Sequence, residues 1–334
     1  DLLWSDVAED RATAAVIDTH YRNANFRLTV SGEFMNRLLP QLPMMAEPVS
    51  ETVKGALVSG QSQVTNQIDV DLIPDPNRLN FEIKTQGQVM SDTMARTKSV
   101  RVFNQGFAWF VVTKPITVDR NGIDISQNAY SVGRAQQKLV DIQSNADNIP
   151  LVGSFIRRIA ESKVREETPE TNQLFRRKVV TQAEARVEET LAKQVVKVET
   201  DAQKYLQQPL IALELDPEPV QLATTEKQII MRYRLAGRDQ MAANTSRPQD
   251  LPDSLVSVQV HQSLLNNAIA RIGLNGNTFN SEELAEHLQK VLALDPKTVE
   301  ADTDQRGRDA SFKFADHDPI RIAFVEDHVN ITLN

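Results

Sequence analysis

The chain has 334 residues, of which 40% are hydrophobic and 25% are charged, and its formal net charge is −8. This composition is typical of a folded protein with room for two domains of ordinary size. The negative charge argues against a general nucleic-acid binder, which needs a basic face to neutralise phosphates. No apolar run approaches the roughly 18–20 residues that a membrane-spanning helix requires. The absence of cysteine excludes disulfides, thiol catalysis and thiolate metal sites, but it does not fix the compartment.

The N-terminal segment Asp1–Asn23 is polar, with apolar residues at helical spacing. We predict a short amphipathic helix there. The chain begins with Asp and not with Met, as a chain does after removal of a signal peptide or an anchor, or when the sequence starts inside a longer chain.

The segment Arg27–Leu39 occurs twice in the chain. It reads RLTVSGEFMNRLL, and Ser257–Ile269 reads SVQVHQSLLNNAI, so that Asn36 aligns with Asn266 without a gap. In each copy an alternating run with the period of a strand is followed by apolar residues with the 3.6 period of a helix. Both copies therefore predict a strand that runs directly into an amphipathic helix. We expect the following helix positions to be buried: Phe34, Leu38, Leu264 and Ala268.

A shorter similarity supports a duplication. Asp75–Phe81 reads DPNRLNF and Asp318–Phe324 reads DPIRIAF, in the same order along the chain as the first pair but at a slightly larger separation. We predict a first repeat at residues 1–240, a linker at 241–254 and a shorter second repeat at 255–334. Chance recurrence of strand–helix units and Asp-Pro turns is the alternative explanation.

Residues 57–125 predict an antiparallel meander with one face in the core and one in water. The predicted inner positions are Val64, Ile68, Val70, Leu79, Phe81 and Ile83. The predicted outer positions are Asn66, Asp69, Asp71, Glu82 and Lys84. Asn-Gln-Gly at 104–106 and Asn-Gly at 121–122 predict hairpin connections.

Residues 136–208 predict helix, divided at Pro150 and Pro169 because proline opens helices more readily than it continues them. From Glu170 to Gln208 neither Gly nor Pro interrupts, and a helix of that length would span roughly 55–60 Å. It could lie along a long sheet or pair with another helix. Its charged residues predict a solvated face, and its apolar stripe includes Val180, Val187, Leu191 and Val198.

The C-terminal third predicts short elements around turn signals. Residues 210–215 and 228–235 predict strands on either side of the turn-rich DPEP at 216–219. The second repeat then predicts a helix opened by Asn280, followed by strands at 310–314, 320–325 and 329–333.

Motifs of common catalytic and cofactor sites are absent from the sequence, which has no phosphate-binding glycine loop, dinucleotide fingerprint, HExxH or GxSxG. The loop that begins at Asp302 fails as an EF-hand, because Arg306 and Lys313 stand where oxygen ligands are needed. The Asp-His-Asp run at 316–318, with His328, could hold a cation, although a turn before Pro319 explains the same residues. We predict no catalytic residue, no cofactor and no metal.

The repeated motif at Val30–Leu39 and Val260–Asn267, with the meander and the long helix, resembles the tubular lipid-binding (TULIP-like) superfamily. That resemblance implies an α+β fold in which a long curved antiparallel sheet packs around a long helix, often in duplicate, with an apolar groove for lipid tails. It carries over no functional residue, because the family binds through a surface and not through a fixed motif.

We therefore expect non-enzymatic binding of a lipid or another apolar ligand in an extracytoplasmic compartment, with no nucleic-acid partner and no transmembrane segment. The alternative is a structural or interaction protein of the cell envelope that engages protein partners through its long helix and sheet edges. An apolar groove favours the first, and a filled core with an exposed apolar stripe favours the second. The candidate groove residues are Val64, Ile68, Val70, Leu79, Phe81, Ile83, Val187, Leu191 and Val198.

Overall fold

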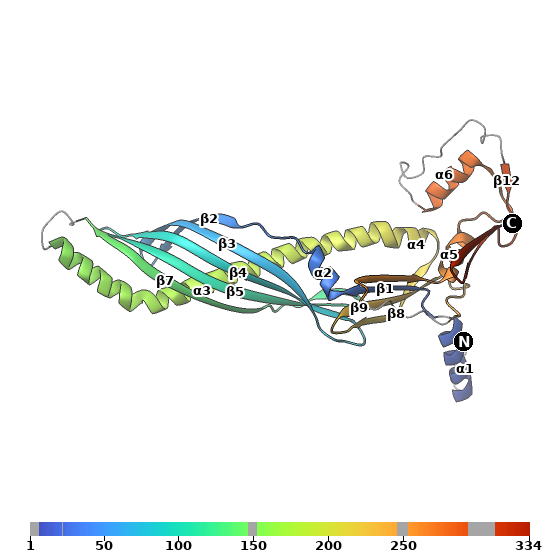
Figure 1. The fold of residues 1–334 in the computed structure, drawn as a ribbon, viewed down its shortest axis with the longest axis horizontal. Helices are drawn as coiled ribbons and strands as arrows, with labels where there is room; N and C mark the ends of the chain where they lie inside the picture. The colour runs from blue at the N-terminus through green and yellow to red at the C-terminus, as the bar shows by residue number, and fades with distance from the viewer. Residues whose placement is uncertain (1–6, 22, 146–151, 246–252, 293–310) are drawn as a thin grey trace.

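The computed structural model describes residues 7–21, 23–145, 152–245, 253–292 and 311–334. The molecule is elongated, with a curled sheet and a long helix at one end and a second sheet that leads to the small C-terminal elements at the other (Figure 1). Its accessible surface is 22704 Å², whereas a compact protein of 37.4 kDa would expose roughly 14,000 Å². The excess is consistent with the elongated shape.

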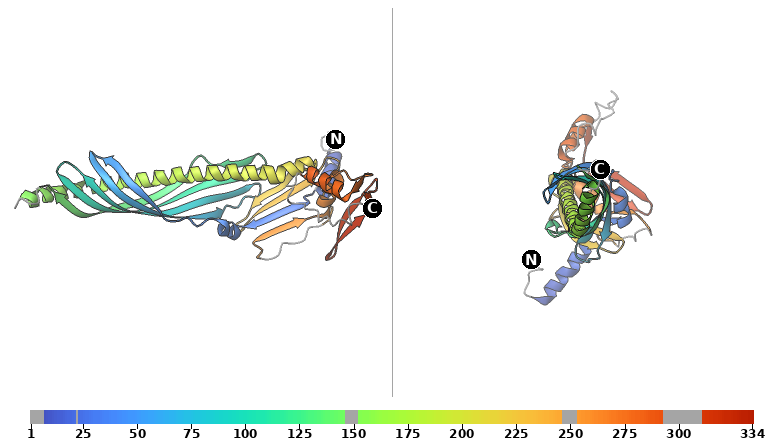
Figure 2. Two further views of the ribbon diagram at one scale, coloured as in Figure 1. Left: turned by 90° about the horizontal axis from the view of Figure 1, so that it is seen from above. Right: turned by 90° about the vertical axis from the view of Figure 1, so that its left-hand side faces the viewer.

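Six strands form the curled sheet as a meander, which confirms the predicted α+β fold with a long antiparallel sheet. Consecutive strands from β2 to β5 pair antiparallel, and β5 then pairs with both β6 and β7. The strands are β2 (Met45–Val53), β3 (Ala56–Leu72), β4 (Leu79–Arg96), β5 (Val100–Asp119), β6 (Gly122–Ile125) and β7 (Tyr130–Ser144). Seen along the long axis, the sheet curves around the helix (Figure 2).

Alternation along β3 sets which side chains face the helix. Val64 and Val70 are buried, and Ile68 is half-buried between them. Asn66 shares their parity and lies on the same inner face, so its predicted outward orientation is wrong. The reason is that position along a strand, and not polarity, decides the face of the sheet.

The predicted hairpin at 104–106 is also wrong, because β5 runs without a break from Val100 to Asp119. Gly106 faces inward, where a Cβ atom would come within 2.4 Å of Ser91 Oγ and 3.0 Å of the Phe175 ring. The glycine therefore makes room for a helix side chain and does not serve a turn. The Asn-Gly hairpin is confirmed, with Gly122 at a φ of 124° between β5 and β6.

The long helix α3 (Val152–Ala202) has 51 residues and runs through Pro169. It continues through a π-helical turn at Gln203–Gln207 into α4 (Gln208–Ala212). The predicted break at Pro169 and the predicted end of the helix at Gln208 are therefore wrong. Proline removes one backbone donor from a helix, and here the hydroxyls of Thr168 and Thr171 donate to backbone carbonyls one turn earlier, at 2.7 and 2.9 Å.

Residues 136–144, predicted as helix, belong to β7. Apolar side chains lie on both faces of this strand, since Val132 and Val140 are exposed while Ala135 and Leu139 point inward and are half-buried. The period of two is therefore weak in the sequence, and the pattern does not separate strand from helix.

The second sheet has the strand order β10, β1, β9, β8. Its strands are β1 (Phe26–Ser31), β8 (Asp216–Thr224), β9 (Gln228–Ala236) and β10 (Val256–Val260). The DPEP segment is the start of β8 and not a turn, and residues 210–215 are not a strand. A small core of Leu79, Leu222 and Ile229 joins this sheet to the curled one.

Both copies of the repeated motif are a strand followed by a helix, as predicted: β1 leads into α2 (Gly32–Leu38) and β10 into α5 (Gln262–Arg271). The two strands pair with each other antiparallel, with Leu28 opposite Val258. These two positions are equivalent in the sequence alignment, so the pairing has a local two-fold character.

The aligned asparagines make the same contacts. Asn36 Nδ2 donates to Val70 O at 2.9 Å, and Val70 N donates to Asn36 Oδ1 at 2.7 Å. Asn266 holds Ile322 in the same way, at 2.7 and 2.8 Å. The duplication, with its boundaries at 1–240, 241–254 and 255–334, stays a proposal that this shared geometry supports.

Two details differ from the predicted repeat. The asparagine contacts make β13 (Ile320–Val325) the counterpart of β3, because Asn266 binds β13 as Asn36 binds β3. The DPNRLNF/DPIRIAF similarity would instead make β13 the counterpart of β4. Leu38 is 67% exposed, contrary to expectation, and Phe34, Leu264 and Ala268 are only half-buried. The helix α2 is short and contacts mainly β3 and β1, so its outer side remains open.

The other described elements are small. The N-terminal helix is α1 (Ala8–Tyr21). The C-terminal ones are β11 (Thr278–Asn280), α6 (Ser281–Leu292), β12 (Ser311–Lys313), β13 and β14 (His328–Leu333). The predicted helix start at Asn280 is confirmed: Glu283 N donates to Asn280 Oδ1 at 2.8 Å and Asn280 N to Glu283 Oε2 at 2.9 Å, which is a reciprocal cap.

We predict that Asn36→Ala and Asn266→Ala each lower the free energy of unfolding by about 1–3 kcal/mol, because each leaves a strand N–H and carbonyl without partners. Asn77→Ala, in an exposed turn, is the control and should stay within about 0.5 kcal/mol of the parent. Urea denaturation followed by circular dichroism measures the three values. Equal stability of all four proteins would contradict the assigned role of the asparagines.

Candidate functional site

The helix α3 contacts the two edges of the curled sheet unequally. On the β7 side it packs closely: Gln137 N donates to Asn172 Oδ1 at 2.8 Å, and the Ser131 hydroxyl bonds to Glu184. A Cβ atom on Gly133 would lie 2.7 Å from a methyl group of Val180. The β7 edge is therefore closed against the helix.

On the β2 side three ion pairs bridge a wider gap, which we call the slit. Glu51 pairs with Lys178 at 2.6 Å and Glu47 pairs with Arg186. Just after β2, Lys54 pairs with Glu170 at 2.5 Å. Lys178 and Arg186 are eight residues apart on the helix, about 12 Å, and Glu47 and Glu51 are four apart on the strand, about 13 Å. The two spacings match, which explains how the pairs form a regular series.

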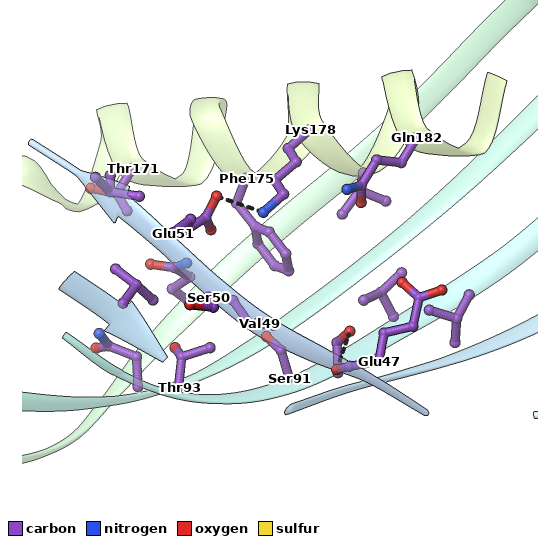
Figure 3. A pocket seen from close by; sticks show the side chains of 18 of the residues that line it. Glu47, Val49, Ser50, Glu51, Ser91, Thr93, Thr171, Phe175, Lys178 and Gln182 are labelled. Atoms are coloured by element: carbon purple, nitrogen blue, oxygen red, sulfur yellow. Dashed lines mark hydrogen bonds and ion pairs between the residues drawn. The ribbon is translucent and has the colours of Figure 1, made fainter. Parts of the chain in front are cut away.

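Behind the slit lies an elongated cavity of about 1280 Å³, enclosed by β2, the concave face of the sheet and α3 (Figure 3). Its inner wall near the middle of the sheet is apolar, with Val64, Val89 and Phe110 facing Val179 and Val187 of the helix. Towards the start of α3 the wall is mixed: its apolar residues include Val58, Ala95, Val102, Ile156 and Ile159, and Lys163, Glu167 and Thr168 also line it.

A polar strip crosses the concave face between these apolar zones. Ser62 lies opposite Ser91, and Gly60 lies opposite Thr93, on β3 and β4. Ser91 is only 8% exposed, and its hydroxyl has no hydrogen-bond partner within the described part of the chain. Further along, the buried Oδ1 of Asn66 also lacks a partner there. Buried polar atoms are normally hydrogen-bonded, so these groups are available to a bound molecule.

The structure brings five of the nine predicted groove residues to the cavity wall: Val64, Ile68, Ile83, Val187 and Leu191. Phe81 packs against the same core without lining the cavity. Leu79 belongs to the core that joins the two sheets, and Val70 is buried where Asn36 binds β3.

Val198 is 54% exposed and does not line the cavity. The expectation that it does is therefore corrected. The buried stripe on α3 is Val179, Ala183, Val187 and Leu191, and no described residue of α3 after Leu191 is buried. Periodicity predicts which side of a helix is apolar, but it does not show where the covering sheet ends.

Sequence reasoning missed the charged residues of the slit. Glu47 and Glu51 occupy inward positions of β2, where half-buried odd positions alternate with exposed even ones. The alternation Met-x-Glu-x-Val-x-Glu-x-Val is visible in the sequence, but it mixes apolar and acidic residues on one face and so gives no clean strand signal. Phe175 was also missed, because it precedes Val180, the first residue named in the predicted apolar stripe.

A buried charged side chain lies between β5 and α3, outside the cavity. Lys114 has only 4% of its side chain exposed, and its Nζ donates to Glu188 Oε1 at 2.8 Å and to the Gln127 carbonyl at 3.4 Å. This contact ties α3 to β5 beyond the cavity. It is a structural pair, since neither residue lines the cavity.

Metal sites and membrane-spanning helices are absent from the described residues. No group of three or more His, Asp or Glu side chains in them is placed to hold a metal ion. None of their helices is long and apolar enough to cross a membrane.

No family model and no curated protein matches the chain. Among solved structures, the crystal structure of a lipopolysaccharide binding protein is similar, with a TM-score of 0.28 and 11% sequence identity. The alignment covers 80% of this chain and 64% of that one, so the chain spans less than two thirds of the neighbour's length. At this TM-score the likeness carries no argument about function.

We predict that Glu188→Gln destabilises the protein by about 1–3 kcal/mol, because it weakens the main partner of a buried ammonium group. Lys114→Met should be neutral or stabilising, since it removes the buried charge and keeps the aliphatic volume. Thermal and urea unfolding compare the two variants. A larger loss for Lys114→Met than for Glu188→Gln would contradict this account of the pair.

Proposed function

We propose that this protein binds a lipid or another apolar ligand without catalysis, in an extracytoplasmic compartment. The cavity between β2 and α3 carries the proposal. Its volume of about 1280 Å³ exceeds the roughly 300–1,000 Å³ of common small-molecule sites. Protein interiors are otherwise close-packed, with few voids larger than a water molecule, so an apolar space of this size is suited to a ligand.

The shape of the cavity favours a chain-like ligand. Its wall follows the strands of the curled sheet from Ile68 and Ile83 towards Val102, and it follows α3 from Leu191 back to Ile156. An alkyl chain that lies along this wall would bury its methylene groups, each of which contributes about 0.8 kcal/mol to binding.

The absence of catalysis is part of the proposal and is supported by the composition of the cavity wall. No histidine lines the described cavity. The buried Ser91 hydroxyl, the best placed candidate for a nucleophile, has no base within hydrogen-bond distance among the described residues. A nucleophilic serine needs such a base. The extracytoplasmic location rests on the resemblance of the repeated motif alone.

A second candidate function, an interaction protein of the cell envelope, is favoured by a different observation. The hairpin of β13 and β14 exposes a series of apolar side chains, which are 40–70% exposed: Phe324, Val325, Val329, Ile331 and Leu333. Exposed apolar surface of this kind commonly marks a contact with another molecule. The exposed part of α3 and the free edge of β14 would be the surfaces for a protein partner.

Displacement of a fluorescent fatty acid by saturated fatty acids of increasing length tests the leading proposal. We expect the dissociation constant to fall by about fourfold per added methylene until the cavity is filled. A constant affinity across chain lengths would contradict binding in the cavity and would favour the interaction protein.

Val89→Trp should lower the affinity for the longest fatty acid by at least about tenfold, because Val89 is 7% exposed and lines the cavity. Met90→Trp, at the next position of β4, is the matched control, since Met90 is 59% exposed on the outer face. Isothermal titration measures both. Equal affinities of the two variants would place the ligand elsewhere.

A further inference from the structure

The charges around the cavity differ from those of the rest of the chain. The chain as a whole has a formal net charge of −8. The cavity lining, in contrast, contains five basic and four acidic side chains. Since Lys54 pairs with Glu170 outside the lining, the lining is close to neutral, in contrast to the anionic chain as a whole.

The basic groups lie at the mouth of the cavity. Lys178 extends from α3 across the slit to Glu51, next to Phe175 and above Ser91 and Thr93 (Figure 3). Arg186 reaches Glu47 in the same way two turns further along the helix. Each cation thus lies on the slit, between the ends of the cavity wall that Ile156 and Leu191 mark on α3, where it can meet a head group that stays at the slit.

The glutamate partners are easily replaced. The four side chains of these two pairs are 35–41% exposed, and ion pairs exposed to this extent contribute roughly 0–1 kcal/mol. Glu47 and Glu51 belong to an edge strand that is bonded to β3 alone within the described sheet. The carboxylates can therefore turn towards solvent without breaking a core.

We propose that Lys178 and Arg186 bind the anionic head group of an amphiphile, and that Glu51 and Glu47 occupy the same cations when the cavity is empty. The inference rests on the proposed function, because it needs an apolar chain in the cavity. A carboxylate or phosphate group would take the place of the two glutamate carboxylates at these cations. The guanidinium fork of Arg186 suits two oxygens of such a group, and both side chains are long enough to turn towards one head group.

Two features predict specificity for an anionic head group, beyond a general preference for lipid. The cations sit on α3 beside the polar strip, where Ser91 offers a buried hydroxyl without a partner in the described residues. The glutamates compete with the ligand, so removing their charge strengthens binding of an anion. A purely structural pair would show the opposite, because its loss would weaken the site.

The test measures binding of lipids that share their chains and differ in head-group charge. Palmitic acid is compared with hexadecanol, and dipalmitoyl phosphatidic acid with dipalmitoyl glycerol, so that a carboxylate and a phosphate are each tested against a neutral relative. We expect the parent to prefer each anionic lipid. The Glu47→Gln/Glu51→Gln variant should bind the anionic lipids roughly fivefold to tenfold more tightly, with no change for the neutral ones.

The Lys178→Gln/Arg186→Gln variant should lose most of the preference for anionic lipids and keep its affinity for the neutral ones. Glu33→Gln/Arg37→Gln is the matched control, since this exposed ion pair lies on α2 and not in the cavity wall. Its affinities should equal those of the parent. Melting temperatures of all variants establish that they fold.

Different results would contradict the inference and the proposed function. Equal binding of charged and neutral lipids in the parent, unchanged in the variants, would overturn the inference and leave the proposed function standing. Weaker binding of anionic lipids after Glu47→Gln/Glu51→Gln would also overturn it, because the glutamates would then support the site. Failure of every lipid to bind the parent would contradict the proposed function itself.

Discussion

The structure depends on the unequal contact between α3 and the two edges of the curled sheet. At β7 the contact is direct, with Val180 over Gly133 and the Asn172 side chain bonded to the strand backbone. At β2, within the described part of the chain, long side chains that form ion pairs bridge the gap. The sheet is thus anchored directly to the helix at one edge and stands away from it at the other. The cavity and the slit both follow from this asymmetry.

Much of the fold could be predicted from the sequence because period-two alternation and the repeated strand–helix motif are local signals. The errors occurred where tertiary contacts replace local ones. Pro169 looks like a helix start, but α3 continues through it while packing along β7 and β5. Gly106 is typical of a turn, but here its missing side chain leaves space for the Phe175 ring. Neither partner can be known before the helix and the sheet are placed together.

The site could be predicted only in part, for related reasons. Parity on β3 correctly brings Val64 and Ile68 to the cavity wall, yet parity also brings Asn66 there, which polarity alone assigned to water. From the sequence alone, Glu47 and Arg186 look like solvent-exposed charged residues. They form an ion pair because the curvature of the sheet brings β2, its first strand, close to α3. A charged residue on the inner face of an edge strand indicates a site of this kind, but its face can be assigned only when the strand register is known.

The central claim, that a ligand binds in the cavity behind the slit, can be tested by bridging the slit. The chain has no cysteine, so Glu51→Cys with Lys178→Cys can be joined by a short cleavable thiol linker. Ser131→Cys with Glu184→Cys, across the closed edge at β7, is the control. The structure predicts that bridging the slit blocks uptake of a fluorescent fatty acid, that cleavage restores it and that the control bridge has no effect. Unchanged uptake with the slit bridged would contradict the claim.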